Sequence, residues 1–192
     1  HGGNRTGRIF TGDRSGDWLF ASLYRVGLAT RPTSVSAGDG QQMRGARVVA
    51  AVRCAPPANK PTPAERDTCR PWLVRDLELV RPTLRAIVAL GGFAWTALWP
   101  ALRQAGYPVP ARRPVFGHDA RVPLPGAGPR SDSRSDIVVL GCYHPSQQNT
   151  FTGRVTEAML DAVLGAAAEL AGLSSAGPAG AGPAGPPAAP RG

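Results

Sequence analysis

The sequence has little cysteine, almost no lysine and no long apolar run, and each shortage narrows what the chain can be. Its three cysteines are an odd number, which argues against a secreted disulfide framework and favours a reducing compartment. No stretch of 18 apolar residues occurs, so the sequence predicts no membrane-spanning helix. At 192 residues the chain is long enough for one α/β domain with a core of its own.

Positive charge comes almost entirely from arginine. The chain has 22 basic and 13 acidic residues, a formal net charge of +9, and Lys60 is its only lysine. Such an excess suits a polyanionic partner, because binding to phosphates proceeds by charge neutralisation and release of counterions. An arginine-rich genome would produce the same balance. Charge alone therefore leaves nucleic-acid binding and compositional bias open.

The two ends of the chain differ from its middle. The chain starts with HGGN rather than methionine, and motif-like residues appear within its first ten positions, so we expect a fragment that lacks an amino-terminal part. Residues 174–192 consist of Gly, Ala, Pro and Ser up to the final Arg-Gly pair, a composition too poor in apolar bulk to pack. We therefore expect one domain over 1–173 and a disordered tail over 174–192.

Hydrophobic patterning predicts an α/β fold in which strands and helices alternate. Thr62-Pro63-Ala64-Glu65 has the form of a capping box with proline in the first turn, so a helix is expected to begin there. Pro71 should kink this helix or delay its start. Its buried face is expected to carry Cys69, Trp72, Leu73, Leu77 and Val80. The predicted strands are 47–52, 86–90 and 136–140, and the predicted helices are 15–27, 62–80, 93–105 and 154–172.

The connections between these elements are expected to be loops and turns. Residues 1–14 read as a Gly/Arg/Thr loop, and Gly91-Gly92 as a tight turn. The Pro/Gly/Arg-rich segment 107–135 holds at most a short strand near Val115. The repeated strand–helix order implies a central, mostly parallel sheet with helices on both faces, a three-layer α/β/α arrangement.

The most informative segment is 141–150, with the sequence GCYHPSQQNT, directly after the predicted strand 136–140. It places a histidine and a row of amides and hydroxyls at the carboxyl end of a strand, where ligands bind in open α/β sheets. If the strands are parallel, the loops 1–14, 54–62 and 142–152 converge there. Together these loops offer Phe10, Asp13, Asn59, Lys60, His144 and Asn149.

Each of these residues alone also has an ordinary structural explanation. A histidine after a strand is often a structural hydrogen-bonding group, an aspartate in TGDRSG a turn or cap residue, and a phenylalanine a core residue. Jointly they describe a pocket that suits an enzyme taking a base out of the stack, because a ring holds the flipped base and an amide reads its edge. An imidazole can stabilise negative charge on the departing base, and a carboxylate can stabilise the sugar cation or align a water.

Three segments together resemble the family 5 (type B) uracil-DNA glycosylases, which are iron–sulfur members of the uracil-DNA glycosylase superfamily. They are GRIFTGD at 7–13, VRCAPPANKPTP at 52–63 and HPSQQNT at 144–150, in the family's order and spacing. The resemblance covers residues 1 to about 172. The related family 4 has an asparagine four residues before the position that Cys54 occupies in this chain. Ala50 stands there in this chain, which favours family 5 and a less strict recognition of uracil.

The resemblance implies a role for each residue of the site. Phe10 would stack on the flipped base, and Asn59 would lie at the pocket and read that base. Asp13 would be the carboxylate of the catalytic loop, and His144 would support the leaving base. The DNA contacts would come from Ser146, Gln147, Gln148, Asn149 and Arg154, with residues 147–149 bordering the loop that enters the duplex.

The resemblance also assigns two of the three cysteines. From their spacing alone, two buried thiols are the simpler explanation of Cys54 and Cys69. Family 5, however, binds a [4Fe–4S] cluster through four cysteine thiolates. Cys54 and Cys69 match its second pair of metal ligands, so this chain carries an incomplete ligand set. Cys142 is not a cluster position. It forms a nucleophilic dyad with His144 only if the two side chains touch, which residues two apart in an extended segment need not do.

Taken as a whole, the resemblance implies a monomeric DNA glycosylase of the bacterial cytoplasm that works on the nucleoid. It would hydrolyse the N-glycosidic bond of uracil in double- or single-stranded DNA and leave an abasic site, in base excision repair. Hypoxanthine and other deaminated bases are further substrates in this family. Lys60 is expected to contact a phosphate or base rather than form a Schiff base.

Two other interpretations remain open. In the first, the chain is a non-catalytic DNA-binding remnant that keeps the basic surface. In the second, it is a nucleotide-binding module, although no Gly-rich phosphate fingerprint follows a strand.

Overall fold

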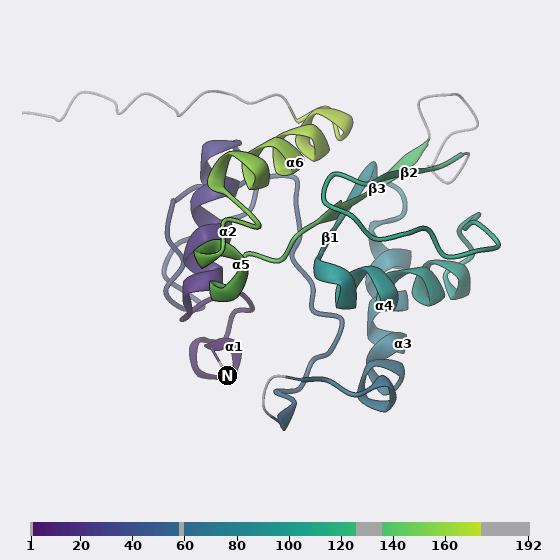
Figure 1. Cartoon of the computed structure of the whole chain (residues 1–192), viewed down its shortest axis with the longest axis horizontal. Coiled ribbons are helices and arrows are strands. Elements are labelled where there is room, and N and C mark those ends of the chain that lie inside the picture. The colour runs from purple at the N-terminus through teal and green to yellow at the C-terminus, as the bar shows by residue number, and fades with distance from the viewer. Residues whose placement is uncertain (1, 58–59, 126–135, 174–192) are drawn as a thin grey trace, which may run out of the picture.

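The computed structural model describes residues 2–57, 60–125 and 136–173 (Figure 1). The predicted tail 174–192 lies outside these residues. Within them, no helix is long and apolar enough to cross a bilayer. The elements are α1 (Gly2–Thr6), α2 (Arg14–Arg25), α3 (Pro63–Val80), β1 (Ala86–Leu90), α4 (Gly91–Gln104), β2 (Arg121–Leu124), β3 (Ile137–Cys142), α5 (Gln147–Phe151) and α6 (Glu157–Leu170).

A three-stranded sheet in the order β1-β3-β2 lies at the centre. β1 pairs with β3 in parallel, from Ala86 opposite Val138 to Leu90 opposite Cys142. β2 pairs with β3 antiparallel, so the described sheet is small and mixed rather than mostly parallel. The predictions of strands at 86–90 and 136–140 are confirmed to within one or two residues.

The strand predicted near Val115 is wrong. Val115 is 89% exposed. The preceding backbone is held against α4, because the indole N–H of Trp95 in that helix donates to the carbonyl of Pro114 at 2.8 Å. The strand that pairs with β3 forms later, at Arg121–Leu124. It begins after a turn at Asp119, whose N–H donates to the carbonyl of Gly141 at 2.8 Å.

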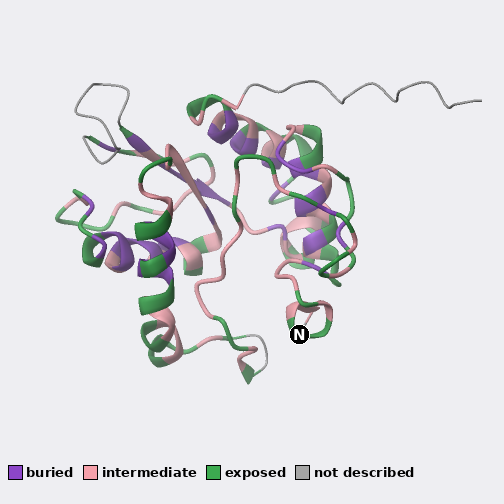
Figure 2. Ribbon diagram, turned by 180° about the vertical axis from the view of Figure 1, so that it is seen from behind, coloured by how far each residue is buried: buried purple, intermediate pink, exposed green. Residues whose placement is uncertain are grey.

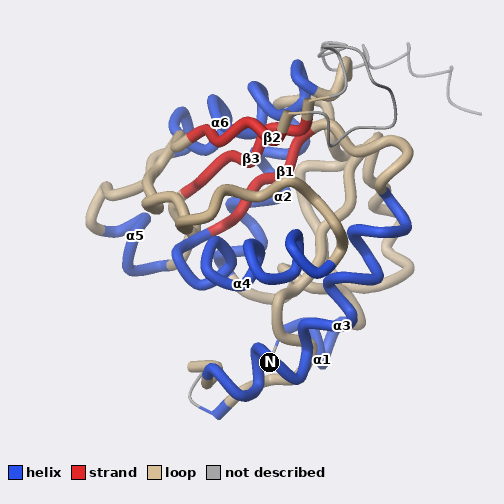
Figure 3. Tube along the Cα trace, turned by 90° about the vertical axis from the view of Figure 1, so that its right-hand side faces the viewer, coloured by secondary structure: helices blue, strands red, loops and turns tan. Residues whose placement is uncertain are grey.

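Alternate residues of the strands contribute to two separate core clusters, as the period of two in a strand requires. Val139 and Ala89 belong to the cluster formed with α3 and α4, around Trp95 and Leu102. Leu140 and its alternating neighbours belong to the cluster formed with α2 and α6. Figure 3 shows the strands between these helices, and Figure 2 shows the buried residues gathered along them.

Helix α3 confirms the predicted capping box and the burial of Leu73 and Leu77, whereas the predicted burial of Trp72 is wrong. The Thr62 hydroxyl accepts from the Glu65 N–H, and the Glu65 carboxylate accepts from the Thr62 N–H at 2.7 Å. The helix neither starts late nor breaks at Pro71. Its buried residues are Leu73, Val74, Asp76 and Leu77, whereas Trp72 is 58% exposed. Trp72 stays outside because it packs under a guanidinium rather than in the core.

The segment 47–52, predicted as a strand, is extended but unpaired. No backbone hydrogen bond joins it to any other described part of the chain, so β-branched residues alone did not make it a strand. Val49 packs against the α3–α4 cluster instead. The predicted Gly91-Gly92 turn is also wrong, because α4 begins directly at Gly91. Gly91 has a positive φ of 90°, which turns the chain from β1 into the helix without a separate loop.

Two glycine-to-alanine changes should alter stability in opposite directions. A Cβ at Gly141 in β3 would lie 2.3 Å from the carbonyl oxygen of Gly117, so Gly141→Ala should lower the unfolding free energy by about 1–3 kcal/mol. A Cβ at Gly165 in α6 would meet Val26 at an ordinary 3.9 Å, so Gly165→Ala should raise it by about 0.5–1 kcal/mol. Urea unfolding followed by circular dichroism measures both, and equal effects of the two changes would contradict this packing.

Candidate active site

The segment before α2 is built around a short helix rather than the loop predicted over 1–14. In α1, the Thr6 hydroxyl donates to the carbonyl of Gly2 at 2.9 Å, which closes one turn. The Arg5 side chain donates to the carbonyl of Gly12 at 2.9 Å. Arg8 forms an ion pair with Asp39 at 2.9 Å. These side chains fix a glycine-rich stretch that backbone propensity alone would leave open.

Phe10 sits in a left-handed backbone conformation with φ of 53°, which is uncommon for an aromatic residue. Its carbonyl packs tightly against α2, because a Cβ at Gly16 would lie 2.1 Å from the Phe10 oxygen. Asp13 caps α2, since its Oδ1 accepts from the Gly16 N–H at 2.9 Å. The helix predicted to start near Ser15 therefore begins one residue earlier, at Arg14. Together these contacts fix the orientation of the Phe10 and Asp13 side chains relative to α2.

His144 follows β3 by two residues, and its neighbours hold it at the edge of the sheet. Gly91, at the end of the paired strand β1, comes so close that a Cβ there would lie 3.2 Å from the His144 Cβ. The side-chain amide of Asn149 donates to the His144 carbonyl at 2.8 Å. The Ser146 hydroxyl accepts from the Asn149 N–H and caps α5. Asn149 and Ser146 therefore stabilise the backbone conformation between β3 and α5.

The structure brings Phe10, Asp13 and His144 together. The ring centroids of Phe10 and His144 are 5.4 Å apart and tilted by 31°. Burial lowers the pKa of His144 below its usual value, and the carboxylate of Asp13 opposes this with a smaller raising effect. The imidazole is therefore neutral at pH 7. A stacking ring, a neutral imidazole and a carboxylate meet at the carboxyl end of β3, where the sequence placed them.

The other predicted site residues are arranged less closely. Asn59 lies outside the described residues, and Lys60 is exposed. The stretch 147–149, expected to border a loop, begins the helix α5, with Gln147 and Gln148 exposed on it. Arg154 lies over the ring of Tyr143, 4.7 Å from its centroid.

Sequence reasoning missed two features beside this site. Arg14, next to Asp13, lies over the ring of Phe151, 4.8 Å from its centroid. Phe151 is 72% exposed at the end of α5. The second feature is His118, whose Nδ1 accepts from the Tyr143 N–H at 3.2 Å. An aromatic residue just after the HPSQQNT motif was the available signal for the first, and nothing in the sequence indicated the second.

Cys142 does not form a nucleophilic dyad with His144. Its side chain is fully buried in the α2–α6 cluster, and its thiol donates to the Tyr143 carbonyl at 3.5 Å. Burial, with a smaller contribution from the negative charge of Asp119, raises the pKa of the Cys142 thiol to about 12. A thiol with that pKa carries almost no thiolate at neutral pH, so it is inert.

Cys54 and Cys69 come from neighbouring segments. Cys54 is exposed and Cys69 is half-buried on α3, and the N–H of Arg53 donates to the Cys69 sulfur at 3.5 Å. Among the described residues, no three His, Cys, Asp or Glu side chains gather as a metal site. Because Cys142 is sealed in the core, this chain's own side chains do not fit a four-thiolate cluster by themselves.

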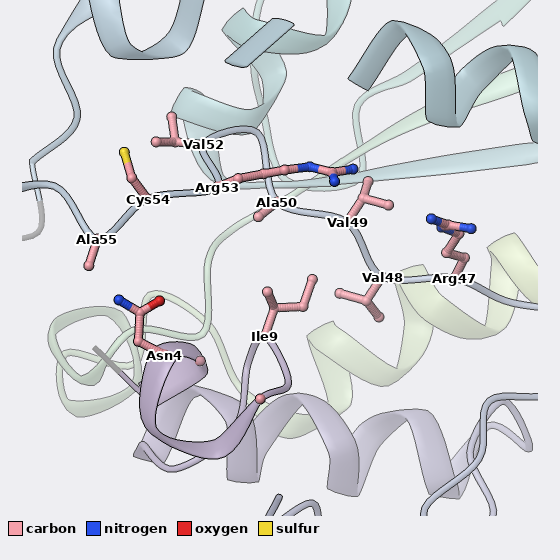
Figure 4. A pocket seen from close by; sticks show the side chains of 12 residues that line it. Asn4, Ile9, Arg47, Val48, Val49, Ala50, Val52, Arg53, Cys54 and Ala55 are labelled. Atoms are coloured by element: carbon pink, nitrogen blue, oxygen red, sulfur yellow. The ribbon is translucent and has the colours of Figure 1, made fainter. Parts of the chain in front are cut away.

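A cavity of about 460 Å³ separates the segment bearing Cys54 from the loop bearing Phe10. Figure 4 shows Asn4 and Ile9 on one side and residues of the 47–55 segment on the other. Phe10 and His144 do not line it. The cavity is therefore lined by Cys54 and by Ile9, the residue before Phe10.

Comparison with known proteins decides the family. A family model described as "Uracil DNA glycosylase superfamily" matches residues 1–168. The chain belongs to this superfamily. The match spans all three segments that carried the resemblance, from the Phe10 loop to the His144 motif.

Several curated relatives carry the name type-5 uracil-DNA glycosylase. The type-5 uracil-DNA glycosylase of Mycobacterium tuberculosis is 56% identical over 173 residues, covering 90% of this chain and 60% of that protein. The Mycobacterium leprae protein of the same name is 53% identical, covering 90% and 70%. That of Thermus thermophilus is 45% identical, covering 90% and 72%. The resemblance to the type-5 family is confirmed, and the chain spans about 60% of the length of the M. tuberculosis relative.

Replacing Asp13 by asparagine should lower the pKa of His144 further. Asparagine caps helices as well as aspartate, so α2 should persist while the negative charge that raises the pKa of His144 is lost. A histidine NMR titration of the unaltered chain and the variant measures the shift. Asp17→Asn, on the same helix but not among the charges acting on His144, is the matched control. An unchanged or raised pKa in Asp13→Asn would contradict the assigned electrostatics.

Proposed function

We propose that this polypeptide performs the chemistry of a monofunctional DNA glycosylase, hydrolysing the N-glycosidic bond of uracil in DNA to leave an abasic site. The observation that carries the proposal is the meeting of Phe10, Asp13 and His144 at one sheet edge, in a chain of this superfamily. A uracil base taken out of the stack would lie against the Phe10 ring. Asn59 would read its edge.

The departing base develops negative charge, and His144 is suited to stabilise it. A neutral imidazole can donate a hydrogen bond through one ring nitrogen to the base carbonyl, and it does so in a partly buried site where that bond is strong. The bond between the sugar and the base breaks, the base leaves with the electron pair, and a water adds its oxygen to the sugar carbon. The water keeps one proton in the new hydroxyl, and its other proton balances the negative charge of the departed base.

Asp13 serves the sugar side of the same step. Its Oδ1 is bound to the Gly16 N–H, whereas Oδ2 accepts no hydrogen bond within the described residues. The side chain is exposed, so a DNA sugar can approach it. The free oxygen would stabilise the positive sugar or align the attacking water. Deaminated bases other than uracil, such as hypoxanthine, would enter by the same route.

DNA would be held by the remaining predicted residues. Arg154 and Arg14 are each laid over an aromatic ring, which orients a guanidinium with little loss of side-chain freedom. Ser146 and residues 147–149 lie on the adjacent turn. We propose a cytoplasmic monomer that acts on double- or single-stranded DNA.

Cys54 and Cys69 would supply two of the four thiolates of a [4Fe–4S] cluster. Such a cluster, when bound, would link the Cys54 segment covalently to α3. The two core clusters on opposite sides of the strands support the three-layer α/β/α arrangement of the complete domain.

The activity is tested by base release from a uracil-containing duplex. The unaltered chain should release uracil, and His144→Ala should lower the single-turnover rate by roughly 10²–10³, the usual cost of losing one such donor. Free uracil is measured by chromatography, and abasic sites by strand cleavage in alkali. Asp17→Asn and a thymine-containing duplex are the controls. DNA binding without any base release would support the remnant interpretation instead.

The DNA contact of Arg154 is tested by salt dependence. Removing one phosphate contact should reduce the slope of log K against log salt by about 0.9, so Arg154→Gln should bind DNA of any sequence more weakly and with a shallower slope. Fluorescence anisotropy over a salt series measures this. Arg75→Gln, an exposed arginine paired with Glu78 on α3, is the matched control and should leave the slope unchanged. A slope equal in all three proteins would remove Arg154 from the interface.

A further inference from the structure

The segment 47–53, which leads directly into Cys54, is held in place without backbone–backbone hydrogen bonds to other described segments. Residues 47–52 share no backbone hydrogen bond with any other described segment, and the chain bends at Ala51. Arg47 and Arg53 are six positions apart. Figure 4 shows both side chains pointing away from Asn4 and Ile9. What the two guanidiniums bind therefore decides where Cys54 lies.

Both arginines bind one carboxylate, that of Asp76 on α3. Arg47 Nη2 lies 2.6 Å from Asp76 Oδ1, and Arg53 Nη2 lies 2.6 Å from Asp76 Oδ2. The Asp76 side chain is only 9% exposed, so its charge needs these partners. A buried carboxylate that accepts from two arginines six positions apart holds both ends of the segment against one helix.

The same arginine connects this ion pair to the second cysteine. Arg53 lies over the exposed ring of Trp72, 5.0 Å from its centroid, and its backbone N–H donates to the Cys69 sulfur. Asp76, Trp72 and Cys69 all lie on α3, whereas Cys54 follows Arg53 directly. These contacts of Arg53 therefore hold the residue before Cys54 against the helix that carries Cys69.

We propose that Asp76 is a positioning residue that, through Arg47 and Arg53, places the thiols of Cys54 and Cys69 side by side as a preformed dithiol. The natural ligand class of such a pair is a thiophilic metal centre. The purpose of the pair rests on the cluster role proposed above, but its placement is independent of any glycosylase activity. A failed base-release assay therefore leaves this inference standing.

Phenylarsine oxide, a dithiol probe, measures the placement without iron. Two thiols replace the oxygen on arsenic, forming two As–S bonds and releasing one water, with arsenic remaining trivalent. Its dissociation constant for the 192-residue chain is determined by competition with a small dithiol. Once one thiol has bound arsenic, a flexible loop would present the second thiol at an effective concentration of only about millimolar. Loss of the ion pair between Asp76 and the two arginines should therefore weaken the binding of phenylarsine oxide by about tenfold. Cys54→Ser and Cys69→Ser should abolish dithiol binding.

Asp76→Asn should weaken the affinity for phenylarsine oxide about tenfold, and Arg53→Gln should weaken it similarly. Asp67→Asn, which removes an exposed carboxylate paired with Arg66 and Arg70 on the same helix, should leave it within twofold. Leu77→Ala is the second control, because it lowers the melting temperature through a core cavity without touching the arginines. If Asp76→Asn does not fold, the exposed Arg53 variant decides the question.

Two results would overturn the inference. Unchanged arsenical affinity in a folded Asp76→Asn or Arg53→Gln protein would show that the thiols do not depend on this tether. Equal loss of affinity in Leu77→Ala would show that Asp76 acts only through overall stability. Circular dichroism of each variant, recorded on the same samples, establishes which are folded.

Discussion

The parallel pairing of β1 with β3 is the constraint on which the candidate site depends. The register runs to Leu90 opposite Cys142, so both strands end at the same edge of the sheet. Immediately beyond that edge, the positive φ of Gly91 turns the backbone from β1 into α4. Because Gly91 has no Cβ, His144, which follows β3, can lie close to it. A one-residue slip would exchange the faces of β3 and turn Val139 from the α3–α4 cluster toward the α2–α6 cluster. The position of the imidazole is thus set by strand register.

The loop that carries Phe10 and Asp13 reaches the same edge by a different kind of restraint. Phe10 has no strand to hold it, and its backbone is in a sparsely populated conformation. What holds it is the contact of its carbonyl with Gly16 and the cap that Asp13 forms on α2. Helix α2 in turn packs on α6 through the α2–α6 cluster, which also receives Leu140 of β3. The Phe10 ring and the His144 imidazole therefore meet because α2 and β3, which position them, pack into the same apolar cluster.

Local signals in the sequence predicted the fold where the deciding interactions were themselves local. The Thr62 capping box, the strand 86–90 and the meeting of Phe10 with His144 all followed from neighbouring residues or from strand order. The segment 47–52 did not, because a strand needs a partner and its side chains bind a distant carboxylate instead. For the same reason β2 was placed too early: its position depends on β3, which is far along the chain. The roles assigned to Asp13 and His144 stay predictions until their chemistry is measured.

The arginines and the histidine of the candidate site respond differently to pH. Arginine stays charged throughout the physiological range, so the proposed contact of Arg154 with a phosphate would not titrate there. His144 has a pKa below its usual value, because burial outweighs the attraction of Asp13. Acidification would therefore protonate the imidazole only below the pH at which an exposed histidine titrates. A DNA phosphate brought near it would favour the protonated form, while exclusion of water by the DNA would oppose that change. Neutrality of His144 is secured by the protein's own packing before DNA arrives, which is what a preorganised hydrogen-bond donor requires.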